Sequence, residues 1–412
     1  MFRATLLLLA FSLPASTAVK AIKFGKLWDG HSVIANAVVI VENDKVQSVT
    51  AKGKIPPGAE VIDLRRYTGI PGMIDAHTHI TYYWNGAADT TPLRQPRRQT
   101  AVTVFLAQEN AKKTLAAGVT TVRDLNARDG ADTAMRDLIN MGAMTGPRMF
   151  VSGQGLGSFA KRPGVTDPIA ETAKQAKATI DGGADWVKVF GSTGGFNNVT
   201  GDQTVSFEEM KAIVDATHAT GHKVAIHSYG PAGARDAIRA GGDTLEHATD
   251  MDDETIAELA RKKIFYVPTI DHNQYYLENA DSTYKFPAGS KENLSNFIQR
   301  NFETAKKAHQ AGVRMIVGSD AVFNGFGSNM RELTWFVKLG MTNEQALQAA
   351  TVLPAEMLGM EKSLGAVAPG YFADIVAVEG DPLADIGAAV NKVRWVMKGG
   401  AVVVDTTQKS AH

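Results

Sequence analysis

The chain of 412 residues contains no cysteine. This absence excludes disulfide bonds and thiolate metal ligands, so any metal site must be built from nitrogen and oxygen donors. An excess of one charge is also missing, because Lys plus Arg and Asp plus Glu both total 43. We therefore expect neither nucleic acid nor an anionic membrane surface as a partner.

The sequence also lacks a long apolar run at its start. The apolar stretch from Leu6 to Leu13 is well below the ~20 residues that span a bilayer. Residues 1–18 combine Arg3, this stretch and small residues before position 19, which is typical of a cleaved signal peptide. We expect an exported protein, periplasmic or secreted, without a membrane span.

Short strands are predicted at both ends of the chain. Apolar and polar residues alternate, with Gly and Pro between the strands, which favours a half-buried antiparallel sheet. The predicted strands are residues 21–24, 37–42, 45–50, 60–63, 373–378, 393–398 and 401–405. We infer that residues 19–69 and 367–412 build one small β-sandwich domain.

Residues 70–366 show eight apolar runs that alternate with helical segments. The runs are residues 72–79, 120–125, 148–152, 186–190, 223–227, 244–247, 264–269 and 314–319. This order predicts an α/β fold of the (β/α)8 TIM-barrel type. A doubly wound open sheet is the alternative, since strand number alone does not prove closure. Residues 153–157 lack the spacing of a dinucleotide-binding loop.

Potential metal ligands stand at the ends of the apolar runs, which is where the chemistry of a (β/α)8 barrel lies, and one more stands inside the fourth run. They are His77, His79, Lys188, His227, His247 and Asp320. His77 and His79 share one face of their strand, because side chains two residues apart project together. Imidazole and carboxylate donors suit a borderline divalent ion such as zinc.

The remaining histidines are not placed in this way. We interpret His31, His218, His222, His309 and His412 as structural or exposed. His218 and His222 are four residues apart, but no glutamate lies next to them as in a zinc-binding helix. His272 follows the seventh run and stays ambiguous between a loop residue and a substrate contact.

Lys188 needs a chemical explanation, because an ammonium group cannot bind a metal ion. Carbamylation by carbon dioxide would convert it into a carboxylated lysine. Reaching the neutral amine at pH 7 from a pKa of ~10.4 costs about 4.6 kcal/mol. Metal binding at structural sites contributes roughly 10 kcal/mol or more and can drive this reaction. A strand lysine paired with a carboxylate is the alternative.

Taken together, these residues resemble the binuclear metal-dependent branch of the amidohydrolase superfamily. The resemblance is carried by residues 71–79, by residues 369–376 and by the split β domain. It implies two divalent ions, with zinc as the expected metal. His77, His79 and Asp320 would bind the first ion, His227 and His247 the second, and carboxylated Lys188 would bridge both.

A finer resemblance is to Xaa-Pro dipeptidase-like, carboxypeptidase-like and ochratoxin amidohydrolase enzymes. It is carried by residues 183–188, by Gly194-Gly195 and by His227-Ser228-Tyr229. It implies cleavage of an amide bond to a C-terminal amino acid, in a dipeptide or an N-acyl amino acid, with ochratoxin-like substrates included.

We expect a hydroxide bridging the two ions to attack the scissile carbonyl. Asp320 would act as general base and then as general acid. Tyr229 would donate its hydroxyl group to the developing oxyanion, unless it is simply a loop residue.

Alternative functions share the same scaffold. A deaminase or cyclic-amide hydrolase, or a lactonase or phosphotriesterase-like hydrolase, would use most of these ligands. Mononuclear deaminases do not need the strand lysine, so two ions per chain would favour the amidohydrolase prediction. A noncatalytic binding module is the third class, but it would not need all six ligands.

Substrate contacts are predicted from the loops. Residues 81–85, Tyr275, Tyr276, Phe323 and Phe326 would form aromatic walls that suit an apolar acyl group. Arg94, Arg97 and Arg98 would receive a substrate carboxylate or form a solvated helix start. The expected partners are a small-molecule or dipeptide substrate and further copies of the chain.

Overall fold

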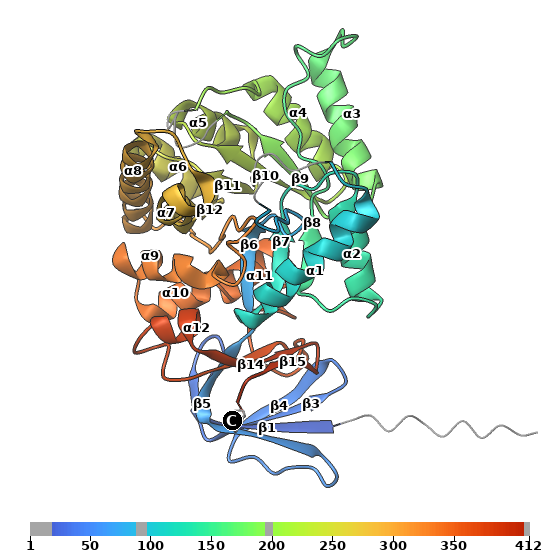
Figure 1. Cartoon of the computed structure of the whole chain (residues 1–412), viewed down its shortest axis with the longest axis vertical. Helices are drawn as coiled ribbons and strands as arrows, with labels where there is room; N and C mark the ends of the chain where they lie inside the picture. Colours follow the sequence, from blue (N-terminus) through green and yellow to red (C-terminus); the bar gives the residue numbers. More distant parts are fainter. Residues whose placement is uncertain (1–18, 88–96, 194–200, 408–412) are drawn as a thin grey trace, which may run out of the picture.

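The computed structural model describes residues 19–87, 97–193 and 201–407. The predicted signal peptide, Arg94 and Gly194-Gly195 lie outside the described residues, so export stays a prediction. The described residues form a β sheet at one end and a mixed α/β body at the other (Figure 1). None of the described helices is both long and apolar enough to cross a membrane.

Strands from both ends of the chain form one sheet. They are β1 (Val19–Trp28), β2 (Val33–Ala35), β3 (Ala37–Glu42), β4 (Lys45–Ala51), β5 (Glu60–Pro71), β13 (Ile375–Val378), β14 (Val393–Lys398) and β15 (Ala401–Asp405). The order is β15-β14-β13-β5-β1-β3-β4, with β2 paired to β1. The last strands thus lie directly beside β5, which leads into the α/β body.

The sheet is not wholly antiparallel as predicted, because β1 and β5 pair in parallel. β4 already runs in the direction of β1, since β3 is antiparallel to both. Residues 52–59 then bring the chain back to the end of the sheet at which β4 starts. β5 therefore runs in the same direction as β4 and β1.

The apolar side chains of this sheet form one core. Phe24, Val39, Ile375 and Trp395 come from four different strands, and each is at most 1% exposed. The start of β4 also reaches the segment before β13, where Val46 N donates to Tyr371 O at 3.0 Å. The two ends of the chain are therefore held together by burial, which contributes roughly 1.5–3 kcal/mol per large apolar side chain.

The α/β body contains two parallel sheets. The first holds β6 (Met73–Thr78), β7 (Val119–Asp124) and β8 (Arg148–Val151), and the second holds β9 (Trp186–Phe190), β10 (Lys223–Ser228), β11 (Thr244–His247) and β12 (Phe265–Val267). Seven of the eight predicted runs are therefore strands. They read as continuous apolar runs because helices cover parallel sheets.

The eighth predicted run, residues 314–319, is not a regular strand. Ile316 N donates to Tyr266 O at 3.1 Å, and Ala76 N donates to Val317 O at 2.9 Å. Val317 N, however, donates to Ala349 O at 2.9 Å instead of extending either ladder. The segment thus contacts both sheets, but the described strands do not form a closed, regularly hydrogen-bonded barrel.

Helices lie around these two sheets (Figure 1). They are α1 (Thr100–Ala116), α2 (Ala131–Asn140), α3 (Pro168–Asp181), α4 (Phe207–His218), α5 (Pro231–Ala240), α6 (Asp253–Lys262), α7 (Ile270–Glu278), α8 (Ser290–Gln310), α9 (Glu332–Lys338), α10 (Asn343–Ala349), α11 (Val352–Leu358) and α12 (Gly387–Asn391). A π-helical turn, η1 (Ala280–Tyr284), and a 3-10 turn, η2 (Asn329–Arg331), complete the set.

Local sequence signals explain the helix ends. Ser206 and Glu209 form a capping box that starts α4. Gly241, with φ of 93°, ends α5 in the left-handed conformation that glycine adopts without strain. Because each helix returns the chain to the start of the next parallel strand, the carboxyl ends of β9, β10 and β11 lie at one edge of their sheet.

Candidate metal centre

Four strands, the residue after β6 and the residue after the eighth apolar run supply the six predicted ligands. His77 lies in β6 and His79 directly follows it, whereas Lys188, His227 and His247 lie in β9, β10 and β11. The sheet register sets Lys188 opposite Ala225 and His247 opposite Ser228. Asp320 follows the irregular segment 314–319, and its backbone N donates to His77 O at 2.7 Å.

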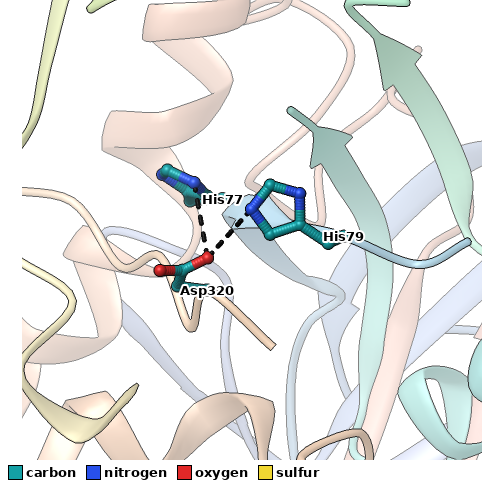
Figure 2. Close-up of side chains that lie close together, drawn as sticks. All are labelled: His77, His79 and Asp320. Carbon is teal, nitrogen blue, oxygen red and sulfur yellow. Dashed lines mark ion pairs between the residues drawn. The ribbon is translucent and has the colours of Figure 1, made fainter. Parts of the chain in front are cut away.

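His77, His79 and Asp320 form a group in which the candidate donor atoms all lie within 4.8 Å of one another. Asp320 Oδ1 is 3.0 Å from His79 Nε2 and 3.6 Å from His77 Nε2. Figure 2 shows both imidazoles turned towards the same carboxylate oxygen. Asp320 Oδ2 lies 3.4 Å from His272 Nε2, so His272 belongs to this group of contacts.

The other two histidines lie beside this group. The His247 ring centroid is 4.9 Å from that of His77 and 4.6 Å from that of His227. Tyr229 stacks on His247 at 5.1 Å and meets the edge of His227 at 4.8 Å. The structure therefore places Tyr229 directly over the two histidines that were predicted as second-ion ligands.

Three buried nitrogen atoms in this region have no hydrogen-bond partner within the described part of the chain: His77 Nε2, His79 Nδ1 and Lys188 Nζ. Lys188 is only 1% exposed. Leaving a buried polar group unpaired costs about 1–3 kcal/mol, more if it is charged. Buried nitrogens without a partner are tolerated where a bound ion would pair with them. The donor set therefore fits a metal site.

The charge states also fit metal binding. Burial and then Lys188 lower the pKa of His77 to about 4, and burial holds the pKa values of His227 and His247 well below their usual range. Burial alone would raise the pKa of Asp320, but the neighbouring histidines outweigh it and the pKa lies well below its ordinary value. Neutral imidazole and ionised carboxylate are the forms that bind metal ions.

Two of these residues occupy a strained backbone. His247 has φ of 72° and Asp320 has φ of 48°, and neighbouring Thr269 has φ of 50°. Left-handed conformations in residues other than glycine cost about 1–3 kcal/mol and cluster at functional sites. His247 Nδ1 and Thr269 Oγ1 are hydrogen-bonded at 2.7 Å, which orients the His247 ring.

A buried ion pair behind His77 was not predicted from the sequence. His77 Nδ1 is 2.7 Å from Glu246 Oε2, and Arg123 donates to Glu246 Oε1 at 2.8 Å. Burial alone would raise the pKa of Glu246, but Arg123 and His77 lower it to about 2. The available signal was a Glu and an Arg inside apolar strand runs, where unpaired charges are rarely buried.

Asp75 is a second missed residue. It accepts hydrogen bonds from Ser319 N at 2.9 Å, from Ser319 Oγ at 2.6 Å and from Asn329 Nδ2 at 2.9 Å. These contacts tie β6 to the loop that carries Asp320. Asp75 is therefore the link that sets His77 and Asp320 at a fixed separation.

The predicted aromatic wall lies next to His79. Tyr82 stacks on His79 at 4.8 Å, and Phe323 lies 6.1 Å from Tyr82. Trp84, Val322 and Phe323 pack together in one buried cluster. Arg97, in contrast, pairs with Asp129 at 2.7 Å and is 75% exposed, which agrees with the solvated interpretation.

The sequence pattern of the Amidohydrolase family matches residues 68–403. The chain belongs to this family. The resemblance drawn from residues 71–79 and 369–376 is therefore confirmed, and the amidohydrolase chain described here is a hydrolase that acts on C–N bonds.

Similar proteins include the ochratoxinase of Aspergillus niger, which is 29% identical over 373 residues, covering 80% of this chain and 74% of that protein. A crystal structure of a Xaa-Pro dipeptidase with bound methionine has a TM-score of 0.83 and 27% identity, covering 93% of this amidohydrolase and 99% of that chain. A prolidase complexed with N-methylphosphonate-L-proline has a TM-score of 0.82 and 25% identity, covering 94% and 100%.

Proposed function

We propose that this amidohydrolase is a binuclear metal-dependent enzyme that cleaves an amide bond to a C-terminal amino acid, in a dipeptide or an N-acyl amino acid. The observation that carries the proposal is a set of three buried nitrogens on the predicted ligands that have no hydrogen-bond partner among the described residues: His77 Nε2, His79 Nδ1 and Lys188 Nζ. The names of the ochratoxinase, the dipeptidase and the prolidase support the choice of bond.

The proposed ligands follow the two groups of the site. His77, His79 and Asp320 would hold one ion, and His227 with His247 would hold the other. Their nitrogen and oxygen donors suit zinc, which fits a chain without cysteine. Bound ions would supply Lewis acidity, lowering the pKa of water and polarising the scissile carbonyl.

Lys188 would join both ions as a carboxylated lysine. Burial lowers the pKa of this amine to about 8. Reaching the neutral amine at pH 7 then costs about 1 kcal/mol, less than it costs from the ordinary pKa of a lysine. The neutral amine attacks carbon dioxide, a C–N bond forms, and one proton leaves as the carbamate appears.

Asp320 would move the proton. Its Oδ1 faces His77 and His79, whereas its Oδ2 faces His272 at 3.4 Å. We propose that Oδ2 takes the proton of the attacking water and passes it to the leaving nitrogen. His272 would orient the carboxylate for this transfer.

Tyr229 would act on the substrate oxygen. It is 8% exposed and is fixed between His227 and His247 by ring contacts. Burial raises the pKa of its hydroxyl group, so the group stays protonated and can donate to the developing oxyanion.

For the fold, we propose a (β/α)8 barrel with a β-sandwich domain from both chain ends. Support comes from the irregular segment 314–319, whose hydrogen bonds reach both β12 and the β6 strand. On the other side, Leu156 N donates to Lys188 O at 2.8 Å and so connects the segment after β8 to β9. These bonds would complete the ring that the two regular sheets leave open.

The test measures metal content and hydrolysis in the same samples. We expect two divalent ions per purified chain and release of an amino acid from a panel of N-acyl amino acids and dipeptides. His77→Asn should lose metal and activity together. His218→Asn is the matched control, because His218 is 42% exposed and pairs with Asp243 away from the site. One ion per chain, or hydrolysis that is independent of metal, would refute the proposal.

A further inference from the structure

We infer that the buried pair of Arg123 and Glu246 fixes the tautomer of His77 and so determines how tightly the amidohydrolase binds its first metal ion. This inference rests on the proposed function, because it assigns His77 as a ligand. It makes Glu246 and Arg123 positioning residues, which act through His77 without touching substrate.

The geometry leaves Glu246 a single role towards His77. Both side chains are at most 1% exposed, and Glu246 Oε2 lies 2.7 Å from His77 Nδ1. Glu246 is ion-paired with Arg123, whose side chain is 0% exposed, so its carboxylate has no proton to give. An ionised carboxylate only accepts hydrogen bonds, so His77 Nδ1 must carry the hydrogen.

The consequence appears at the other ring nitrogen. With the hydrogen on Nδ1, the neutral imidazole presents a bare lone pair at Nε2. This is the buried atom without a hydrogen-bond partner among the described residues, 3.6 Å from Asp320 Oδ1. A carboxylate behind a ligating histidine fixes the ring and raises its basicity, and removing it typically costs 10–100-fold in metal affinity.

Arg123 holds the carboxylate in place from the opposite sheet. It donates to Ala76 O at 2.6 Å, to Thr244 Oγ1 at 3.0 Å and to Glu246 at 2.8 Å. Its guanidinium group also lies over the Trp186 ring at 4.5 Å. Arg123 extends from β7, while Thr244 and Glu246 belong to β11. The pair therefore links the two sheets immediately behind the ligand.

Glu246→Gln tests the tautomer directly. Arg123 requires an acceptor, so the amide oxygen of the new side chain turns to Arg123 and its NH2 group faces His77 Nδ1. That arrangement favours the hydrogen on Nε2 and blocks the ligand atom. We expect metal affinity, measured by competition with a chelator, to fall 10–100-fold.

A second substitution should restore the affinity. In the double variant Arg123→Met with Glu246→Gln, no cation competes for the amide oxygen. The amide NH2 group can donate to Thr244 Oγ1, which lies beside Glu246 Oε1, and the oxygen can accept from His77 Nδ1. We expect this variant to bind metal more tightly than the single variant. A folded double variant with no recovery would overturn the inference.

A matched control separates positioning from stability. Arg148 and Asp374 form another largely buried ion pair, with side chains 17% and 6% exposed. Neither residue pairs with a predicted ligand. Arg148→Gln should lower the melting temperature of the metal-free protein without changing metal affinity. If Glu246→Gln does the same, the pair is only structural and the inference is wrong.

The unaltered chain gives an independent measurement if the variants do not fold. Nitrogen-15 spectra of the metal-free protein, with His77 assigned by comparison to His77→Asn, report which ring nitrogen is protonated. Hydrogen on Nδ1 supports the inference, and hydrogen on Nε2 overturns it. Failure of the unaltered chain to take up metal would instead refute the proposed function and the inference with it.

Discussion

Replacing Lys188 with methionine should stabilise the metal-free amidohydrolase and destabilise the metal-loaded one. The ammonium group is 1% exposed and its Nζ has no hydrogen-bond partner within the described residues. Burial lowers its pKa from 10.5 to about 8. Methionine has a similar length without the charge, so it removes the burial cost and preserves the volume.

The magnitude follows from the pKa shift. Lowering the pKa from 10.5 to about 8 corresponds to about 3 kcal/mol. The folded state has the lower pKa, so the unfolded chain binds more protons between about pH 8 and 10.5. Stability of the metal-free protein should therefore rise with pH across that window, with the full cost present below it.

The assay is denaturant unfolding followed by circular dichroism, at pH 7 and pH 10, with a chelator or with zinc. With chelator at pH 7 we expect Lys188→Met to be more stable than the unaltered chain by about 3 kcal/mol. With zinc the order should reverse, because only the unaltered chain gains the binding free energy of both ions.

A metal-free Lys188→Met protein that is less stable than the unaltered chain would refute this reasoning, because it would mean that Lys188 has a partner in the folded state. Lys398→Met is the control. Burial also lowers the pKa of Lys398 to about 8, but this residue lies near Asp374 and Arg148 in the terminal sheet. Its substitution should leave the stability gained from zinc unchanged.

Three further predictions concern catalysis. Asp320→Asn should keep most of the bound metal but lose roughly 10²–10⁴-fold in turnover, as expected for a general acid–base group; wild-type kcat would contradict the assigned role. Tyr229→Phe should lower kcat by roughly 10²–10³-fold with little change in metal content, because one oxyanion donor is removed; an effect on KM alone would assign Tyr229 to substrate binding. Lys188→Ala should be inactive and should regain part of its activity with added propionate, whose carboxylate can stand in for the carbamate; no rescue by propionate at any concentration would count against carboxylation.

The sequence predicted the strands better than their closure. Seven apolar runs are strands in the structure. Strands of a parallel sheet are buried on both faces, so they appear in the sequence as continuous apolar runs. The eighth failed as a regular strand since Val317 N donates to Ala349 O, a contact between residues 32 positions apart. The parallel pairing of β1 and β5 was missed for the same reason, because sheet order depends on contacts distant in sequence.

Five of the six predicted ligands were accessible from sequence because they stand at or just after the end of an apolar run, whereas Lys188 lies in the middle of β9. Their placement near one another follows from the strand order. Glu246 and Arg123 were not accessible in this way. Alternation along β11 assigns Glu246 to the face opposite His247, and nothing in the sequence says that Arg123 of another sheet reaches it. Positions that support a ligand through a second residue are visible only once the sheets are placed together.

The strained and unpaired groups of the centre point to one physical role for the metal. His247 and Asp320 hold left-handed backbones that cost about 1–3 kcal/mol each, and Asp75 fixes the Asp320 loop against β6. A folded chain retains such costs only when the surrounding structure determines the geometry. We therefore expect the centre to form before an ion binds, so that metal binding would release the cost of the unpaired nitrogens instead of ordering the loops. The metal-free chain should therefore keep its fold, since the hydrophobic cores of the terminal sheet and of the α/β body are built from apolar residues outside the centre.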